Sequence, residues 1–132
     1  MKARVLLVDD YPGVRDSLGH MLCLEGYDVT VAANGREALD SLRQTGFDLV
    51  LLDLDMPVIN GWDTLGQIVT SNLSLPLIVI TGHPDQQWLA TQKGVAAFLE
   101  KPLDMNLLLE VMKRVLAPTA QARGGGTSPK SP

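Results

Sequence analysis

The segment RVLLVDD at residues 4–10 places four consecutive apolar residues directly before two aspartates. Residues 49–55, LVLLDLD, repeat this arrangement. A short apolar run without polar alternation is typical of a strand that is covered on both faces of a sheet. Further runs rich in β-branched or apolar residues complete the set. We predict strands at residues 4–8, 29–33, 49–52, 77–80 and 96–99.

Apolar residues recur at helical spacing between these runs. The repeats are Val14, Leu18 and Leu22; Leu65 and Ile68; and Leu107, Val111 and Val115. Strand and helix therefore alternate five times, which predicts an α/β fold. Because crossovers between parallel strands are right-handed, the expected architecture is an open, doubly wound parallel sheet with helices on both faces. Ligands of such sheets bind at the carboxyl ends of the strands.

Composition excludes several classes of protein. The 132 residues correspond to one domain, and a formal charge of −4 argues against direct nucleic-acid binding. The single cysteine, Cys23, rules out an internal disulfide and is expected to be a buried thiol within a helix. No secretory signal or membrane-spanning run is visible, so we predict a cytoplasmic location without a membrane partner.

The composition changes at Pro118. Residues 118–132 are rich in Pro, Gly and Ser and have too few apolar residues to build a core. We predict that residues 1–117 form the domain and that residues 118–132 are a disordered tail or a shortened linker.

Polar groups follow four of the predicted strands. Asp9 and Asp10 follow the first, Asp53 the third, Thr81 the fourth and Lys101 the fifth. Each group alone is more simply explained as the polar start of a loop. Together, three carboxylates at one sheet edge would repel one another, and a hard divalent cation such as Mg²⁺ would relieve that repulsion. With a lysine and a hydroxyl nearby, the pattern indicates a site for a phosphoryl group.

The chain resembles the receiver (CheY-like) domains of bacterial two-component response regulators. The resemblance extends from residue 4 to about residue 116. It rests on VLLVDD at residues 5–10, LVLLDLDMPVING at 49–61, IVITG at 78–82 and GVAAFLEKP at 94–102.

The resemblance implies a flavodoxin-like strand order of 2-1-3-4-5. It also implies a function in phosphorelay signal transduction. A histidine kinase or a histidine phosphotransfer protein would donate a phosphoryl group to Asp53, with Mg²⁺, or alternatively Mn²⁺, as cofactor. The domain would not be an enzyme in the usual sense, since it would catalyse only its own phosphorylation and dephosphorylation.

The resemblance also assigns roles to single residues. Asp10 and Asp53 would bind the metal directly, Asp9 would bind it through water or orient Asp10, and Asp55 would contribute only its backbone carbonyl. Lys101, with a cis bond to Pro102, would pair with the phosphate. Thr81 and Gly82 would contact the phosphate as well.

The implied switch consists of Thr81 and Phe98, which would move together and alter the face formed by the fourth helix, fifth strand and fifth helix. That face would act on a downstream output domain or protein. The fourth-helix region around Trp88 has few charges, so we expect a monomer or weak dimer, with Trp88 either a partner contact or packed inward. His83 either tunes loss of the phosphate or is a plain surface residue.

Two alternatives remain at this point. Asp53 and Asp55 with a later threonine and lysine also resemble the haloacid-dehalogenase-type phosphatases, although that family carries its acidic metal-binding motif after the lysine. The second alternative is a binding module of the same fold that is never phosphorylated. The complete set of Asp9, Asp10, Asp53, Thr81 and Lys101 argues against it.

Overall fold

A computed structural model describes residues 2–55, 61–71, 75–82 and 95–125 of the chain. Its elements are β1 (Arg4–Val8), α1 (Pro12–Leu24), β2 (Asp28–Ala32), α2 (Gly35–Gln44), β3 (Leu49–Asp53), α3 (Gly61–Ser71), β4 (Leu77–Thr81), β5 (Ala97–Glu100) and α5 (Met105–Gly125). The strands form one parallel sheet in the order β2-β1-β3-β4-β5. This confirms the predicted fold class and strand order. The expected fourth helix, with Trp88 and His83, lies outside the described residues.

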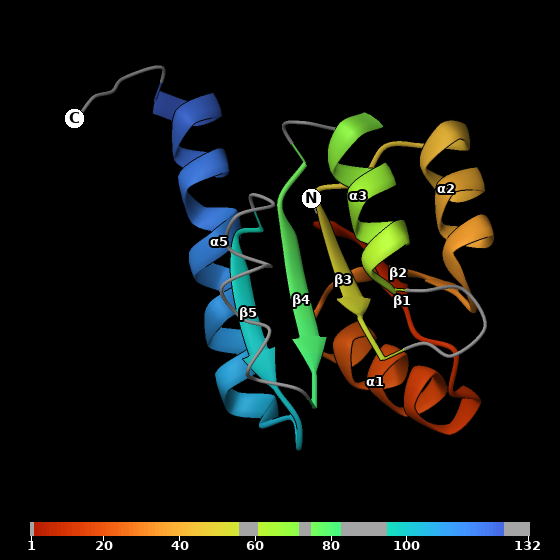
Figure 1. Ribbon diagram of the computed structural model, residues 1–132. Coiled ribbons are helices and arrows are strands. Elements are labelled where there is room, and N and C mark those ends of the chain that lie inside the picture. Colours follow the sequence, from red (N-terminus) through yellow and green to blue (C-terminus); the bar gives the residue numbers. More distant parts are fainter. Residues whose placement is uncertain (1, 56–60, 72–74, 83–94, 126–132) are drawn as a thin grey trace.

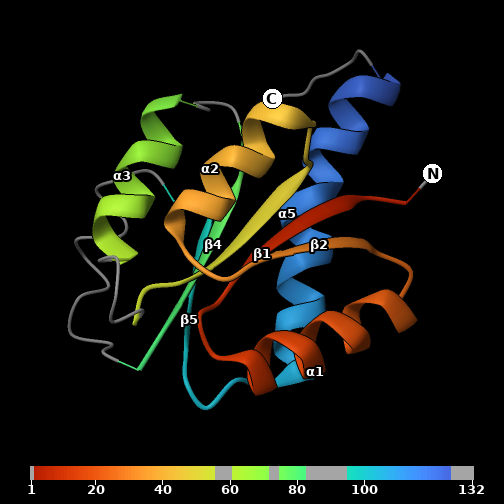
Figure 2. The ribbon, with the colours of Figure 1, turned by 90° about the vertical axis from the view of Figure 1, so that its right-hand side faces the viewer.

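Helices cover both faces of the sheet. Helices α1 and α5 lie on one face, and α2 and α3 lie on the other (Figures 1 and 2). Alternate residues of each strand pack toward opposite faces. Val5 and Leu7 belong to the core cluster beneath α1 and α5, whereas Leu6 and Val8 belong to the cluster beneath α2 and α3. The apolar runs lack polar alternation because both faces of every central strand are buried.

Only some residues of the helical repeats are buried as predicted. Leu18, Leu22 and Val111 are buried as expected, but Val14 and Leu107 are 43% and 45% exposed. Four residues advance a helix by about 400°, so a stripe with that spacing drifts about 40° per step. A three-residue stripe with this spacing therefore does not stay on the buried face along its whole length.

The prediction that Cys23 is buried was wrong, because its thiol lies on the exposed side of α1. Cys23 follows the fully buried Leu22 by one residue. One residue rotates a helix by about 100°, which carries the next side chain away from the core.

Helix α5 continues past Pro118 to Gly125, so the predicted boundary at residue 118 falls within a helix of the structure. The division into a domain and a tail stays a prediction. Among the described helices, none combines the length and the apolar character that a bilayer-spanning segment requires.

The start of α2 brings two helices into close contact. Asn34 caps the helix by accepting a hydrogen bond from the Glu37 amide (2.9 Å), and the Glu37 side chain accepts one from the Ala33 amide (2.8 Å). Gly35 then lies directly against the buried side chain of Thr64 on α3. This contact sets how closely α2 and α3 approach.

Gly35→Ala is expected to lower the free energy of unfolding by about 1–3 kcal/mol, because the added methyl group would overlap the Thr64 side chain. Gly66→Ala is the matched control. Gly66 lies inside α3 with no atom near an added Cβ, so alanine should stabilise the protein by up to about 1 kcal/mol. Urea denaturation of both variants measures the difference, and equal stabilities would contradict the proposed close contact.

Candidate functional site

Strand geometry brings Asp9 and Asp53 together. β1 and β3 are neighbours, and their register pairs Val8 with Leu52, so the next residue of each strand also lies side by side. Side chains alternate along a strand, which places both aspartates toward the α1 and α5 face. The carboxyl ends of β1 and β3 thus place two acidic groups next to each other.

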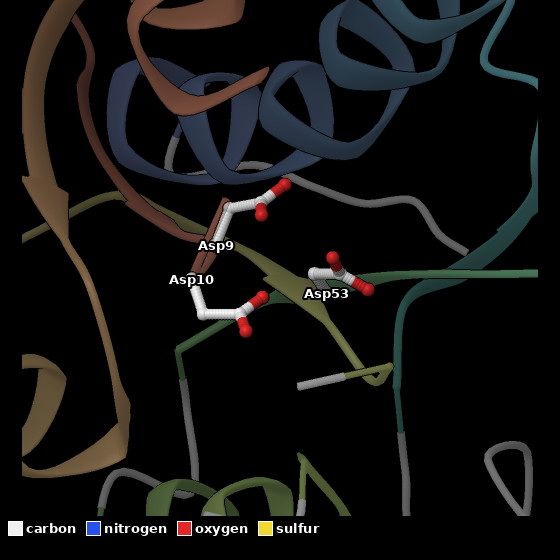
Figure 3. Close-up of side chains that lie close together, drawn as sticks. All are labelled: Asp9, Asp10 and Asp53. Carbon is white, nitrogen blue, oxygen red and sulfur yellow. The ribbon is translucent and has the colours of Figure 1, made fainter. Parts of the chain in front are cut away.

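Asp10 completes an acidic cluster. Asp9, Asp10 and Asp53 each contribute a carboxylate oxygen, and these oxygens lie within 4.8 Å of one another. Figure 3 shows the three side chains grouped at the carboxyl ends of β1 and β3. Asp9 and Asp53 are each only 5% exposed. Such close, poorly solvated carboxylates repel one another unless a cation or a proton intervenes.

The electrostatics of Asp9 reflect this crowding. Burial raises the pKa of the Asp9 carboxyl group, and the negative charges of Asp53 and Asp10 raise it further. A hydrogen bond from the Tyr11 amide to Oδ1 (2.9 Å) and the positive charge of Lys101 oppose the increase only in part. The site favours a positive ion, and all-oxygen ligands suit a hard divalent cation such as Mg²⁺.

Lys101 is the cation that the structure places beside this cluster. Its Nζ lies 3.1 Å from Oδ2 of Asp53 and 3.4 Å from Oδ2 of Asp55. Burial lowers the pKa of Lys101, but the interactions with Asp53 and Asp55 outweigh it, so the pKa is raised overall. The peptide bond to Pro102 is cis, and the Lys101 amide donates to the carbonyl of Thr81 (2.8 Å).

Sequence reasoning missed the side chain of Asp55. The Thr81 hydroxyl donates to its Oδ1 (2.7 Å), and the Gly82 amide donates to its Oδ2 (2.8 Å). Burial raises the pKa of Asp55, but these hydrogen bonds and Lys101 outweigh burial and lower the pKa overall. The only available signal was the position of Asp55, two residues after Asp53, which does not tell where the carboxylate points.

The site opens into a cavity of about 500 Å³. Asp9, Asp10, Asp53, Asp55 and Lys101 form its polar wall. The remainder is apolar and comes from the start of α1, β4 and the loop after β5: Tyr11, Val14, Leu18, Ile80, Pro102 and Leu103. A phosphorylated group that entered the cavity would therefore meet the Asp53 carboxylate, the Lys101 ammonium group and the rest of the acidic cluster together.

Phe98 lies apart from this cavity. It is half-buried on β5 and packs against the core cluster beneath α2 and α3. Thr81 is fully buried at the end of the neighbouring strand β4. The register pairs Val79 with Phe98 and Thr81 with Glu100, so Phe98 lies two residues behind the edge that carries the site.

Comparisons with known proteins identify relatives of the chain. Residues 5–113 match the response regulator receiver domain family. The chain is 39% identical over 123 residues to the transcriptional regulatory protein GlrR of Escherichia coli K12, which covers 91% of this chain. A CheY-like receiver domain protein from Methanospirillum hungatei superposes with a TM-score of 0.85 at 28% identity, covering 92% of this chain and 98% of that one.

The chain is also similar to a second solved structure. The response regulator TrrA of Thermotoga maritima, in complex with Mg²⁺ and BeF, is 33% identical and has a TM-score of 0.79, covering 88% of this chain and 100% of TrrA. By contrast, the chain spans only 28% of the length of GlrR. The family match over most of the chain, together with these similarities, shows that the chain belongs to the response regulator receiver domains of two-component systems.

Proposed function

We propose that Asp53 accepts a phosphoryl group in a metal-dependent reaction. One observation carries this proposal: the carboxylates of Asp9, Asp10 and Asp53 gather within 4.8 Å, with the Lys101 ammonium 3.1 Å from Asp53. Asp53 is the only member of the cluster bonded to that lysine among the described residues. It therefore combines a nucleophilic oxygen with a cation able to neutralise an incoming phosphoryl group.

The acidic cluster would hold the metal. Asp10 and Asp53 would bind Mg²⁺ or Mn²⁺ directly, Asp9 would bind the ion through water or orient Asp10, and Asp55 would bind it through its backbone carbonyl. When bound, the ion would neutralise charge on the phosphoryl oxygens. The raised pKa of Asp9 supports this assignment, because the cluster carries more negative charge than its buried setting accommodates without a cation.

The transfer step uses the residues of the chain as follows. A carboxylate oxygen of Asp53 attacks phosphorus, and the bond from phosphorus to the donor histidine nitrogen breaks with its electron pair leaving on the imidazole. The product is an acyl phosphate on Asp53. Lys101 pairs with the transferred group as a point charge, and the Thr81 hydroxyl and Gly82 amide donate hydrogen bonds to its oxygens. Hydrolysis at the same site would remove the group, so the domain catalyses its own phosphorylation and dephosphorylation.

Signalling would follow from the change at Thr81. When Thr81 binds a phosphoryl oxygen, the end of β4 is fixed, and we propose that Phe98 on the adjacent strand repacks in response. The face that includes β5 and α5 then shifts between two packed states rather than deforming continuously. The contribution of a fourth helix lies outside the described residues.

The partners follow from the family. We propose that a histidine kinase or a histidine phosphotransfer protein donates the phosphoryl group and that a downstream output domain or protein reads the switch. The name of GlrR supports transcriptional regulation as the output of a longer protein. The domain itself is proposed to act in the cytoplasm as a monomer or weak dimer, without contacting nucleic acid.

A titration with beryllofluoride in the presence of Mg²⁺ tests this function. Beryllofluoride mimics a phosphoryl group, so the amide NMR signals of residues 9–10, 53–55, 81–82 and 101 should shift and saturate. Without Mg²⁺ the shifts should be absent or much weaker. A spectrum that ignores both reagents would identify a binding module instead, and rapid turnover of a chromogenic phosphate ester would identify a phosphatase.

A further inference from the structure

The carboxylate of Asp55 already occupies the donors that the proposed function assigns to the phosphoryl group. Oδ1 accepts from the Thr81 hydroxyl at 2.7 Å, and Oδ2 accepts from the Gly82 amide at 2.8 Å. The Lys101 Nζ lies 3.4 Å from the same Oδ2. Both oxygens of the side chain are therefore engaged by the phosphate-contacting groups.

The Thr81 hydroxyl and the Gly82 amide each have one proton, and each proton forms a strong hydrogen bond to only one acceptor at a time. Hydrogen bonds to a carboxylate or a phosphoryl oxygen are charge-assisted, so the two acceptors compete on similar terms. We propose that the Asp55 carboxylate is a resident competitor, which holds Thr81, Gly82 and Lys101 until a phosphoryl group on Asp53 displaces it. This inference rests on the proposed function, since it presupposes that Asp53 carries the phosphoryl group.

The position of Asp55 suits such an exchange. Its amide donates to Oδ1 of Asp53 (2.9 Å), which keeps the backbone of Asp55 beside the phosphoacceptor. Its side chain is 22% exposed, unlike that of Asp53, at 6%. A rotation about the side-chain torsion can therefore carry the displaced carboxylate toward water while the backbone stays in place.

Two consequences follow. The phosphoryl group must displace an existing anion and also approaches a like charge, so Asp55 lowers the affinity of the site for a phosphate mimic. In addition, Thr81 and Gly82 already bind an anionic oxygen before phosphorylation. The change that phosphorylation causes at these two residues is then smaller than it would be without the carboxylate.

The test measures beryllofluoride affinity for the full 132-residue chain at saturating Mg²⁺, which removes any effect of Asp55 on metal affinity. Asp55→Ala should lower the dissociation constant about tenfold, as expected for removing a competing hydrogen-bonded charge. Asp55→Asn, which keeps the shape of the side chain, should show a smaller decrease and tests the idea even if the alanine variant folds poorly. Asp16→Ala, at an exposed site on α1, is the control for the change in net charge and should leave the constant within about twofold.

A second readout is the amide proton of Gly82, which reports the hydrogen bond directly. Without beryllofluoride, Asp55→Ala should move this signal upfield from its position in the unsubstituted protein, because a carboxylate acceptor is lost. Adding the mimic should move it back. An unshifted Gly82 signal combined with unchanged affinity in both Asp55 variants would overturn the inference while leaving the proposed function intact. Failure of the unsubstituted protein and all variants to bind beryllofluoride would instead overturn the proposed function.

Discussion

Asp53→Asn is expected to abolish phosphorylation by acetyl phosphate, with a loss of at least about a thousandfold that leaves no detectable product. An amide has no anionic oxygen with which to attack phosphorus and form an acyl phosphate. Intact-protein mass spectrometry after incubation with acetyl phosphate and Mg²⁺ measures the attached group. Asp16→Asn, which removes an exposed carboxylate of α1, should be labelled like the unsubstituted protein.

The Asp53→Asn variant is expected to lose phosphorylation while remaining folded. Asparagine retains an oxygen that accepts from the Asp55 amide, as Oδ1 of Asp53 does at 2.9 Å. The variant loses the ion pair with Lys101, but it also removes one of three mutually repelling carboxylates. These two effects oppose each other, so the thermal unfolding midpoint should change little. Labelling that persists in a folded Asp53→Asn variant would place the phosphoacceptor at another residue.

The sequence predicted the sheet well because its signals were local and repeated. Each of the five strands begins and ends within one residue of its predicted position. Apolar runs buried on both faces leave few alternatives, and parallel connections allow few topologies. The approach of Asp9 to Asp53 follows from the same geometry, since residues that follow adjacent parallel strands must share an edge.

Details that depend on side-chain direction were not predictable in this way. The position of Asp55 was clear, but only the structure shows that its carboxylate turns toward Thr81 and Gly82. The predictions that Val14 and Cys23 are buried were wrong for a related reason. Helical periodicity identifies which face of a helix is buried, but it does not show where that face ends. The contact between Gly35 and Thr64 joins two helices that are separate in the sequence, and no local pattern marks it.

Asp9→Asn is expected to stabilise the metal-free protein and to weaken Mg²⁺ binding. Asp9 is 5% exposed and its carboxylate lies beside those of Asp10 and Asp53, so its charge opposes folding in the absence of a cation. Asparagine can still accept from the Tyr11 amide, as Oδ1 does at 2.9 Å. The free energy of unfolding should rise by about 0.5–2 kcal/mol, which is typical when a site optimised for function is relieved.

Magnesium should reduce the stability advantage of the Asp9→Asn variant. Binding to the folded state alone stabilises a protein by about 2.7 kcal/mol at a hundredfold excess over the dissociation constant. If Asp9→Asn weakens binding about tenfold or more, the unsubstituted protein gains more from the same concentration of Mg²⁺. Urea denaturation with and without Mg²⁺, and calorimetric titration of the ion, measure both effects. A variant that binds Mg²⁺ as tightly as the unsubstituted protein would remove Asp9 from the metal site.

The pH dependence of stability identifies why Asp9→Asn stabilises the metal-free protein. The pKa of Asp9 is raised above its ordinary value of 3.8, so the folded state binds a proton more tightly than the unfolded state does. The free energy of unfolding therefore falls as pH rises from 3.8 to the folded-state pKa of Asp9. Above that pKa, the destabilisation by the buried negative charge is complete. The gain in stability from Asp9→Asn should accordingly be largest near neutral pH and should disappear below about pH 3.8, where the carboxyl group is protonated in both states. If the variant kept the same gain in free energy of unfolding below pH 3.8, the difference between it and the unsubstituted protein would come from packing and not from charge repulsion.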